Sequence, residues 1–400
     1  MADGLVNMAE TIDQIFVTLK HWLVGFAPEP WQPYLAVLIS IAALMGVFAS
    51  LFAITTILER KGLGRIQNRL GPNRVGPFGF LQPAADGIKA LIKEDLVPRS
   101  ADKVVHFLAP LFLVLPPFLV LALLPVGRNM TLVDFDAGVL FFFAVAASME
   151  LSVFMAGWSS RNKYSLLGAM RAIAQMISYE IPLILSSVTV IMMVGSLSLT
   201  QIVNAQGGLT NGLAQWHVFT PWGFAGFILF MIAATAESNR SPFDLPEGES
   251  EIIAGYYIEY SGFKFALFFL GEYLGLFAVS GLGITLFLGG YHAPLAFLQF
   301  IPSWAWFFLK LVVLIAVFIW VRGTLPRLRQ DQLMNFAWKF MLPMTLLNIL
   351  VAAIWHFMQP LPGITRWVAC SLLVIGSYVL LGRGLVDRGR VGPRTYRFAE

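Results

Sequence analysis

The sequence predicts an all-α integral membrane protein, a polytopic bundle of about nine transmembrane helices. Of the 400 residues, 58% are hydrophobic and only 12% are charged, whereas an average soluble domain carries about 25% charged residues. The mean hydropathy of +0.73 is also high. A chain with so little polar side-chain surface is suited to a lipid bilayer rather than to water.

Residues 1–33 differ from the apolar runs that follow them. They contain Asp3 and Glu10, and they have neither a basic region nor a continuous apolar run, so they do not resemble a secretory signal. Apolar residues recur at helical spacing between Ile12 and Phe26. This pattern predicts an amphipathic helix that lies on a membrane face.

Nine apolar runs are long enough to cross a bilayer, which requires about 20 residues. They lie at about 34–58, 103–126, 137–158, 165–195, 220–238, 262–289, 303–321, 336–357 and 366–382. The long fourth run must tilt or extend beyond the hydrocarbon. The runs therefore predict nine membrane-spanning helices in one domain.

The basic residues are divided unevenly between the two sides of the predicted bundle. Of 27 Lys and Arg residues, 22 fall in the segments after helices one, three, five, seven and nine, and only three fall on the other side. Cytoplasmic loops of membrane proteins are enriched in Lys and Arg. We therefore expect the N-terminus outside, the C-terminal tail in the cytoplasm, and a bacterial inner (plasma) membrane as the location.

Residues that could hold a redox centre are scarce. The only cysteine is Cys370, which excludes a disulfide or an iron–sulfur cluster built within this chain. The five histidines are not placed to ligate a haem, and no glycine-rich nucleotide-binding loop follows a strand. We expect this chain to bind no metal, haem, flavin or iron–sulfur cluster.

The predicted inside loop at 59–103 is too long for a simple connection between helices. An apolar stripe from Leu81 to Ile92 predicts a short amphipathic helix in the membrane interface. A basic run lies beside it, beginning at Arg60 and ending at Arg74. Contact with anionic lipid headgroups, docking of a peripheral partner and steering of a polar headgroup all fit this pattern.

The segment 237–272 is acidic, although the other long inside loops are basic. It holds seven acids, which are Glu237, Asp244, Glu247, Glu249, Glu251, Glu259 and Glu272. Arg240 and Lys264 are its only basic residues. A solvated acidic loop is one interpretation, but the interspersed aromatic and aliphatic residues favour a buried, functional segment.

Four carboxylates fall within predicted helices: Glu150, Glu180, Glu237 and Glu272. A charge near mid-membrane costs about 3 kcal/mol on insertion scales, so these groups are expected to be protonated at times, hydrated or paired. Arg171 and Lys310 also lie within helices and are candidate partners. A series of carboxyls that leads from an acidic loop towards mid-membrane favours proton transfer over structural pairing.

Three long stretches resemble one family closely. They are ERKGLGRIQNRLGPNRVGPFGFLQPAADGIKALIKED (59–95), WSSRNKYSLLGAMRAIAQMISYEIP (158–182) and AESNRSPFDLPEGESEIIAGYYIEYSGFKFALFFLGEY (236–273). They resemble the quinone-site membrane subunit of respiratory complex I (NADH-quinone oxidoreductase), the counterpart of mitochondrial NADH dehydrogenase subunit one. The resemblance covers about residues 34–358, the transmembrane core of eight helices. Residues 359–400 depart from that core as an additional C-terminal helix and a basic tail.

The resemblance implies a non-redox subunit of a proton-translocating NADH:quinone oxidoreductase, with quinone as substrate. Its partners would be peripheral iron–sulfur and quinone-site subunits, and antiporter-like and small membrane subunits, with no nucleic acid. It implies that Arg60, Asp86 and Lys89 line a quinone chamber, together with Arg322 after helix seven. It further implies a proton path and coupling elements made of Glu247, Glu249, Glu251, Glu259, Glu237, Glu272, Glu180 and Glu150.

Other functions remain open at this stage. Membrane subunits of energy-converting hydrogenases share the scaffold, and ferredoxin-linked quinone reductases differ only in a donor that binds far from this chain. A stand-alone ion transporter is a more remote alternative, because such proteins usually show two matching halves around a midplane site. A purely structural anchor for peripheral subunits leaves the intramembrane acids unexplained.

Overall fold

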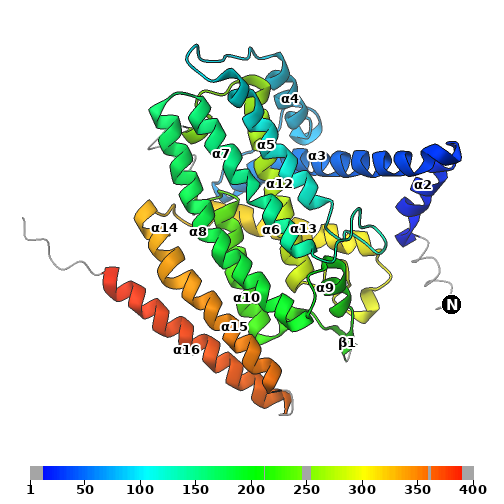
Figure 1. The fold of residues 1–400 in the computed structure, drawn as a ribbon, viewed down its shortest axis with the longest axis vertical. Helices are drawn as coiled ribbons and strands as arrows, with labels where there is room; N and C mark the ends of the chain where they lie inside the picture. The colour runs from blue at the N-terminus through cyan, green and yellow to red at the C-terminus, as the bar shows by residue number, and fades with distance from the viewer. Residues whose placement is uncertain (1–11, 211, 246–253, 359–361, 390–400) are drawn as a thin grey trace, which may run out of the picture.

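The computed structural model describes residues 12–210, 212–245, 254–358 and 362–389, which form an almost entirely helical bundle (Figure 1). The α-helices are α2 (Ile15–Val24), α3 (Gln32–Ile66), α4 (Gln82–Ile92), α5 (Lys103–Leu121), α6 (Gly138–Ala146), α7 (Ser148–Ser159), α8 (Lys163–Val194), α9 (Leu199–Ala205), α10 (Pro221–Glu237), α12 (Gly262–Phe287), α13 (Ser303–Thr324), α14 (Gln330–Phe336), α15 (Leu342–Phe357) and α16 (Gly363–Gly389). Short helical turns are η1 (Glu29–Trp31), η2 (Pro77–Gly79), η3 (His217–Phe219), η4 (Gly255–Tyr257), η5 (Ala296–Leu298) and the π-helical turn η6 (Ala337–Met341). Strands β1 (Leu209–Thr210) and β2 (Leu213–Ala214) form a small antiparallel hairpin.

Eight spans within the described part of the chain are long and apolar enough to cross a membrane. One of them consists of α6 and α7, and another joins α14, η6 and α15. The fifth predicted span corresponds to α10, an apolar helix of 17 residues. At about 1.5 Å per residue α10 is slightly shorter than the ~30 Å hydrocarbon core. The predicted polytopic all-α fold is confirmed.

Polar side chains mark where several helices begin. Asp102 accepts hydrogen bonds from the first free amides of α5 at 3.2 and 3.4 Å, and Asn162 accepts one at the start of α8. Ser198 and Thr220 cap α9 and α10 in the same way. Because the first amides of a helix have no partner within it, such caps fix the boundaries between loops and spans.

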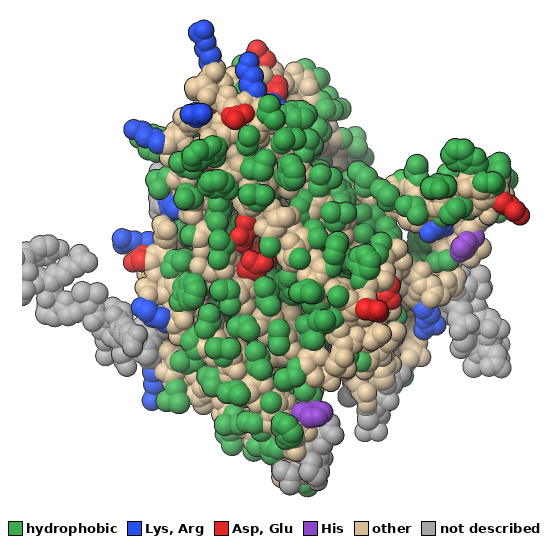
Figure 2. Space-filling model, viewed as in Figure 1, with side chains coloured by type: hydrophobic (Ala, Val, Ile, Leu, Met, Phe, Trp, Pro, Cys, Tyr) green, Lys and Arg blue, Asp and Glu red, His purple; other side chains and the backbone are tan. Residues whose placement is uncertain are grey.

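The centre of the bundle is built around α12, the most deeply buried span. It packs against α5, α10 and α13, and its fully buried aromatic residues include Phe277 and Phe287. Figure 2 shows that hydrophobic side chains cover most of the visible face, while many Lys and Arg side chains lie at its upper and left edges. An apolar exterior over an apolar core is the pattern of a protein surrounded by lipid.

Helix α2 lies within the predicted N-terminal interfacial segment. Its apolar side chains are largely exposed, with Phe16, Leu19 and Trp22 between 50% and 60% accessible. The segment is held by buried Asp13, whose Oδ1 accepts hydrogen bonds from the backbone amide and hydroxyl of Ser303 at 2.7 and 2.5 Å. Phe16 also packs edge-on against Trp304. The exposed apolar face of α2 suits insertion into a membrane interface.

Helix α4 forms where the apolar stripe predicted it. It packs on α3 and α12, and Ile88, Leu91 and Ile92 remain exposed. The loop boundary differs from the prediction, because α3 continues to Ile66 and includes residues 59–66. The helix extends past the apolar run because buried Glu59, which the sequence placed in the loop, is paired with side chains of other segments.

The outer end of α12 is closed by Lys310 from α13. The Lys310 Nζ donates hydrogen bonds to the carbonyls of Leu288, Gly290 and His292, each at 2.7 Å, and lies 4.1 Å from the ring centre of Trp216. Lys310 is therefore not a partner of the intramembrane acids, contrary to the sequence-based expectation. The ammonium satisfies carbonyls that a helix end leaves without partners.

The ninth predicted span is present as α16, which packs mainly on α15 and also contacts α10 (Figure 1). Most of its apolar side chains are exposed, including Ile364 and Leu380. Helix α16 is thus an addition to the edge of the bundle and contributes little to its core.

Candidate functional site

The residues predicted for a quinone chamber lie at the junction of α3 and α4. The Arg60 Nη1 and the Asp86 Oδ2 form an ion pair at 2.6 Å, and Gln82 Nε2 donates to the other Asp86 oxygen at 3.0 Å. Lys89 lies one turn further along α4 and is exposed. The structure therefore brings Arg60 and Asp86 together and places Lys89 on the same short helix.

A second polar cluster lies deeper in the protein around Glu59. The Glu59 carboxylate is 5% exposed and accepts hydrogen bonds from three sources: Arg240 at 3.1 Å, Arg322, and the hydroxyl of Tyr273. The Arg240 guanidinium also stacks on the Tyr273 ring, 4.2 Å from its centre. The four side chains come from α3, α12, α13 and the loop after α10, so the cluster ties the bundle together.

The electrostatics of this cluster keep Arg240 charged. Burial by itself disfavours the guanidinium cation, but the acidic groups of Tyr273, Glu59 and Glu272 raise the pKa of Arg240 above its usual value. A buried ion pair is stable only if its charges have partners. Arg240 is thus a permanent cation that interacts electrostatically with both Glu59 and Glu272.

Sequence reasoning missed most of this cluster. It named Arg322 but placed Glu59 at a loop boundary, and it treated Arg240 only as a countercharge for the acidic loop. The partners are separated by 181 residues for Glu59 and Arg240. The available signal was that Glu59, Arg240 and Tyr273 all fall within the family-like stretches.

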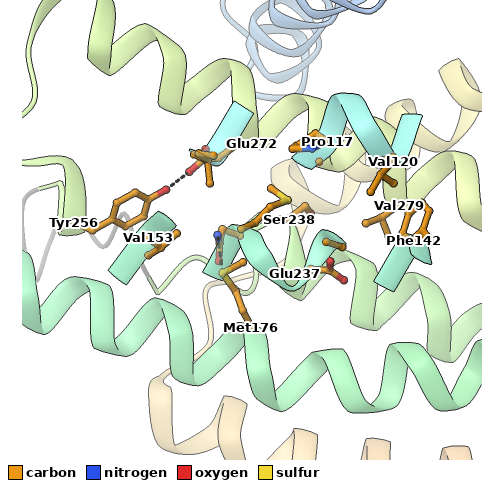
Figure 3. Close-up of a pocket in the computed structure, with 16 residues that line it drawn as sticks. Pro117, Val120, Phe142, Val153, Met176, Glu237, Ser238, Tyr256, Glu272 and Val279 are labelled. Atoms are coloured by element: carbon orange, nitrogen blue, oxygen red, sulfur yellow. Dashed lines mark hydrogen bonds between the residues drawn. The ribbon is translucent and has the colours of Figure 1, made fainter. Parts of the chain in front are cut away.

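The predicted intramembrane acids converge on one region of the bundle. Glu237 and Glu272 line the same cavity, together with Tyr256 and residues of α5, α7 and α8 (Figure 3). The Tyr256 hydroxyl donates a hydrogen bond of 2.8 Å to Glu272. The cavity has a volume of about 30 Å³, and since a buried water needs about 10–15 Å³, it can hold one or two water molecules.

The remaining acids extend from this cavity. The carboxylates of Glu150 and Glu180 lie near enough to that of Glu237 to interact with it electrostatically. The Glu237 Oε2 is buried and has no hydrogen-bond partner among the residues that the structure describes. An unpartnered buried carboxylate oxygen is costly, and such groups are characteristic of functional sites.

Glu259 lies on the loop side of this series. Its Oε1 accepts a hydrogen bond of 2.8 Å from Asn162 at the start of α8. The adjacent Tyr260 stacks on His106 with ring centres 4.0 Å apart and bonds Ser159, and burial raises the pKa of Tyr260 to about 12. Glu247, Glu249 and Glu251 lie outside the described residues.

Potential metal ligands do not cluster in the described ranges. No group of three or more His, Cys, Asp or Glu side chains there could hold a metal ion. Cys370 is buried as a free thiol in α16.

Taken together, the fold and the site define a class: a polytopic helical membrane protein with a buried ion-pair cluster and a series of carboxylates around a small cavity. Residues 39–353 match the family model described as NADH dehydrogenase, and the chain therefore belongs to that family.

Similar proteins agree with this assignment, and those compared here are the membrane subunits designated H of bacterial NADH-quinone oxidoreductases. The chain is 47% identical to the one from Dehalococcoides mccartyi (strain CBDB1), over 87% of this chain and 95% of the relative. It is 46% identical to the one from Geobacillus kaustophilus over 85% of this chain and 100% of the relative, and 46% identical to that from Brevibacillus brevis over 84% and 97%. The resemblance expected from the sequence is confirmed, and the chain is a membrane subunit of an oxidoreductase complex.

Proposed function

We propose that this subunit forms much of the quinone chamber of a proton-pumping NADH:quinone oxidoreductase and couples quinone reduction to proton translocation through buried carboxylates. The electron carriers would belong to neighbouring subunits. The observation that carries the proposal is the position of Arg240, which interacts with Glu59 on one side and with Glu272 on the other. A change of charge near the Glu59 cluster would thus be felt at the carboxylate series.

The chamber would lie along the inner ends of α3 and α4. Arg60, Asp86 and Lys89 would face its polar part, and Arg322 would act through its pair with Glu59. The exposed apolar residues of α4 support contact with the quinone tail, with lipid or with the peripheral subunits that close the chamber. Quinone would bind there as a substrate and not as a resident cofactor.

The proton path would run from Glu259 and the acidic loop through Tyr256 and Glu272 to Glu237, Glu180 and Glu150. The Tyr256–Glu272 hydrogen bond supplies a link that can both donate and accept a proton. The cavity beside Glu237 has room for the water that would complete the path. From Glu150 and Glu180 the protonation change would pass to antiporter-like subunits.

The arrangement in the membrane follows from the charge distribution. We infer that α4 and the basic loops face the cytoplasm of a bacterium, with the N-terminal segment 1–33 on the outer face. Residues 34–358 would form the transmembrane core, and residues 359–400 would add a helix and a cytoplasmic tail. The names of the relatives favour this quinone-linked role over an energy-converting hydrogenase.

A test uses the purified assembly in proteoliposomes, with NADH oxidation by quinone and proton uptake measured together. Tyr256→Phe removes the hydroxyl that bonds Glu272, and we expect both activities to fall by about tenfold or more, as for a lost proton-transfer group. Tyr291→Phe is the matched control, because it removes a hydroxyl bonded to Asn204 at the other end of the bundle. Equal activity in both variants would refute a proton path through Tyr256.

A further inference from the structure

A groove of about 960 Å³ lies on a part of the bundle that the proposed function does not use. Its walls come from α10, α13 and α14, with the segments 242–243 and 325–328 at one end. The walls are mainly apolar, with Phe227, Met231 and Val317 among them. Its size is at the upper end of the ~300–1,000 Å³ range of ligand pockets.

The groove spans about half of the membrane. On α10 its lining residues run from Phe227 to Thr235, which corresponds to about 12 Å at ~1.5 Å per residue. On α13 they run from Leu314 to Val321. One leaflet of a ~30 Å hydrocarbon core is about 15 Å deep, so the apolar walls match the depth of the leaflet on the α4 side.

The end of the groove near that membrane surface is polar and basic. Gln332, Asn335 and Lys339 line it there, and Lys339 is exposed. No acidic side chain is among the described residues that line the groove, and the nearby Asp331 is paired with Arg329 at 3.3 Å. The groove therefore presents a positive charge where a lipid headgroup would lie.

Two further observations fix this end at headgroup depth. Trp338, next to Lys339, is 49% exposed, and exposed tryptophans are typical of the membrane interface. Arg327 lies between two lining residues, Pro326 and Leu328, and its buried Nη2 has no hydrogen-bond partner in the described ranges.

We propose that this groove binds one phospholipid with an anionic headgroup from the leaflet on the α4 side. Its acyl chains lie between α10 and α13, and its phosphate is held at Lys339, within reach of the Arg327 segment. The lipid fills the space between α13 and α14, next to the point where the Leu328 amide bonds the Pro242 carbonyl at 3.0 Å.

The shape of the groove disfavours other occupants. A transmembrane helix from another subunit is about 30 Å long and would cross both leaflets, whereas the walls end near mid-membrane. A quinone carries no negative charge that would match Lys339. Phe318 lines both this groove and the small space beside Glu59, so its ring lies between the two.

The proposal is tested by photolabelling the intact assembly in bilayers that contain phosphatidylglycerol with a photoreactive group in its acyl chain. We expect labelled peptides from α10 and α13. Lys339→Gln should lower their labelling about fivefold, the equivalent of the ~1 kcal/mol that one Lys contributes near an anionic surface. Lys163→Gln is the matched control, an exposed lysine on the same side outside the groove, and should change nothing.

Val317→Trp, which fills the groove, provides a second variant should Lys339→Gln fail to assemble, and it should abolish the labelling. A phosphatidylcholine probe that labels the same peptides equally well would overturn the proposal. Labelling insensitive to the groove variants would also overturn it, as would absence of labelling because a neighbouring subunit covers the groove.

Discussion

The Glu59 cluster makes a quantitative prediction about two ion pairs in the same chain. The Arg240–Glu59 pair is buried, with side chains 10% and 7% exposed, whereas the Arg60–Asp86 pair is 52% and 35% exposed. Breaking a buried pair by removing one partner costs about 3–5 kcal/mol, because a charge is left without a counterion. An exposed pair contributes about 0–1 kcal/mol.

Arg240→Met removes one of three groups that hold the Glu59 carboxylate. Because Arg322 and Tyr273 remain, we expect the cost to lie somewhat below that of an isolated pair, at about 2–4 kcal/mol. Arg60→Met is the matched control and should cost less than about 1 kcal/mol. The double variant Glu59→Gln/Arg240→Met should be more stable than Arg240→Met alone, since the stranded carboxylate is gone.

The assay is the temperature at which half of the detergent-solubilised assembly is lost on heating, followed by size-exclusion chromatography. Unfolding of such assemblies is often irreversible, so only the order of the variants at one heating rate is compared. The predicted order is wild type and Arg60→Met highest, then the double variant, then Arg240→Met. Equal losses for Arg60→Met and Arg240→Met, or a double variant less stable than Arg240→Met, would refute the reasoning.

Three further predictions concern the outer part of the protein. Lys310→Met should lower the same midpoint strongly, because three carbonyls lose their donor at about 1–3 kcal/mol for each that stays buried; an unchanged midpoint would contradict the capping role. Asp13→Ala should release α2 and increase proteolysis near it, since two hydrogen bonds of about 1 kcal/mol each are lost; unchanged cleavage would argue against this anchor. Burial lowers the pKa of His217 from 6.5 to about 4, so stability should be lost as the pH falls from about 6.5 to 4, by up to about 3 kcal/mol. His217→Gln should show a smaller loss over that range, and an identical pH profile would exclude His217 as the cause.

Much of the architecture could be predicted because a bilayer imposes strong constraints on sequence. Apolar runs of about 20 residues located the spans, including α16, and the stripe at 81–92 located α4. Glu150, Glu180, Glu237 and Glu272 were identifiable because charged residues within apolar runs are rare.

The partners of charged residues could not be predicted, because pairing depends on packing between distant segments. Hydropathy ends the first span near residue 58, yet α3 continues through Glu59, since Arg240 and Arg322 neutralise that carboxylate. Lys310 was an expected partner for an acid, but the carbonyls at the end of α12 receive it instead. No local pattern in the sequence records where a helix end will lie relative to a neighbouring helix.

The central claim is that buried carboxylates in this subunit couple quinone reduction to proton movement. The most direct measurement is the number of protons translocated per NADH in proteoliposomes that contain the assembly with Glu237→Gln, which keeps the shape of the side chain but removes its titratable group. Glu29→Gln, at an exposed position in η1, is the control. The account predicts that proton translocation falls by about tenfold or more in Glu237→Gln, with quinone reduction slowed alongside it, and that the control matches wild type. Undiminished proton translocation by Glu237→Gln would contradict it.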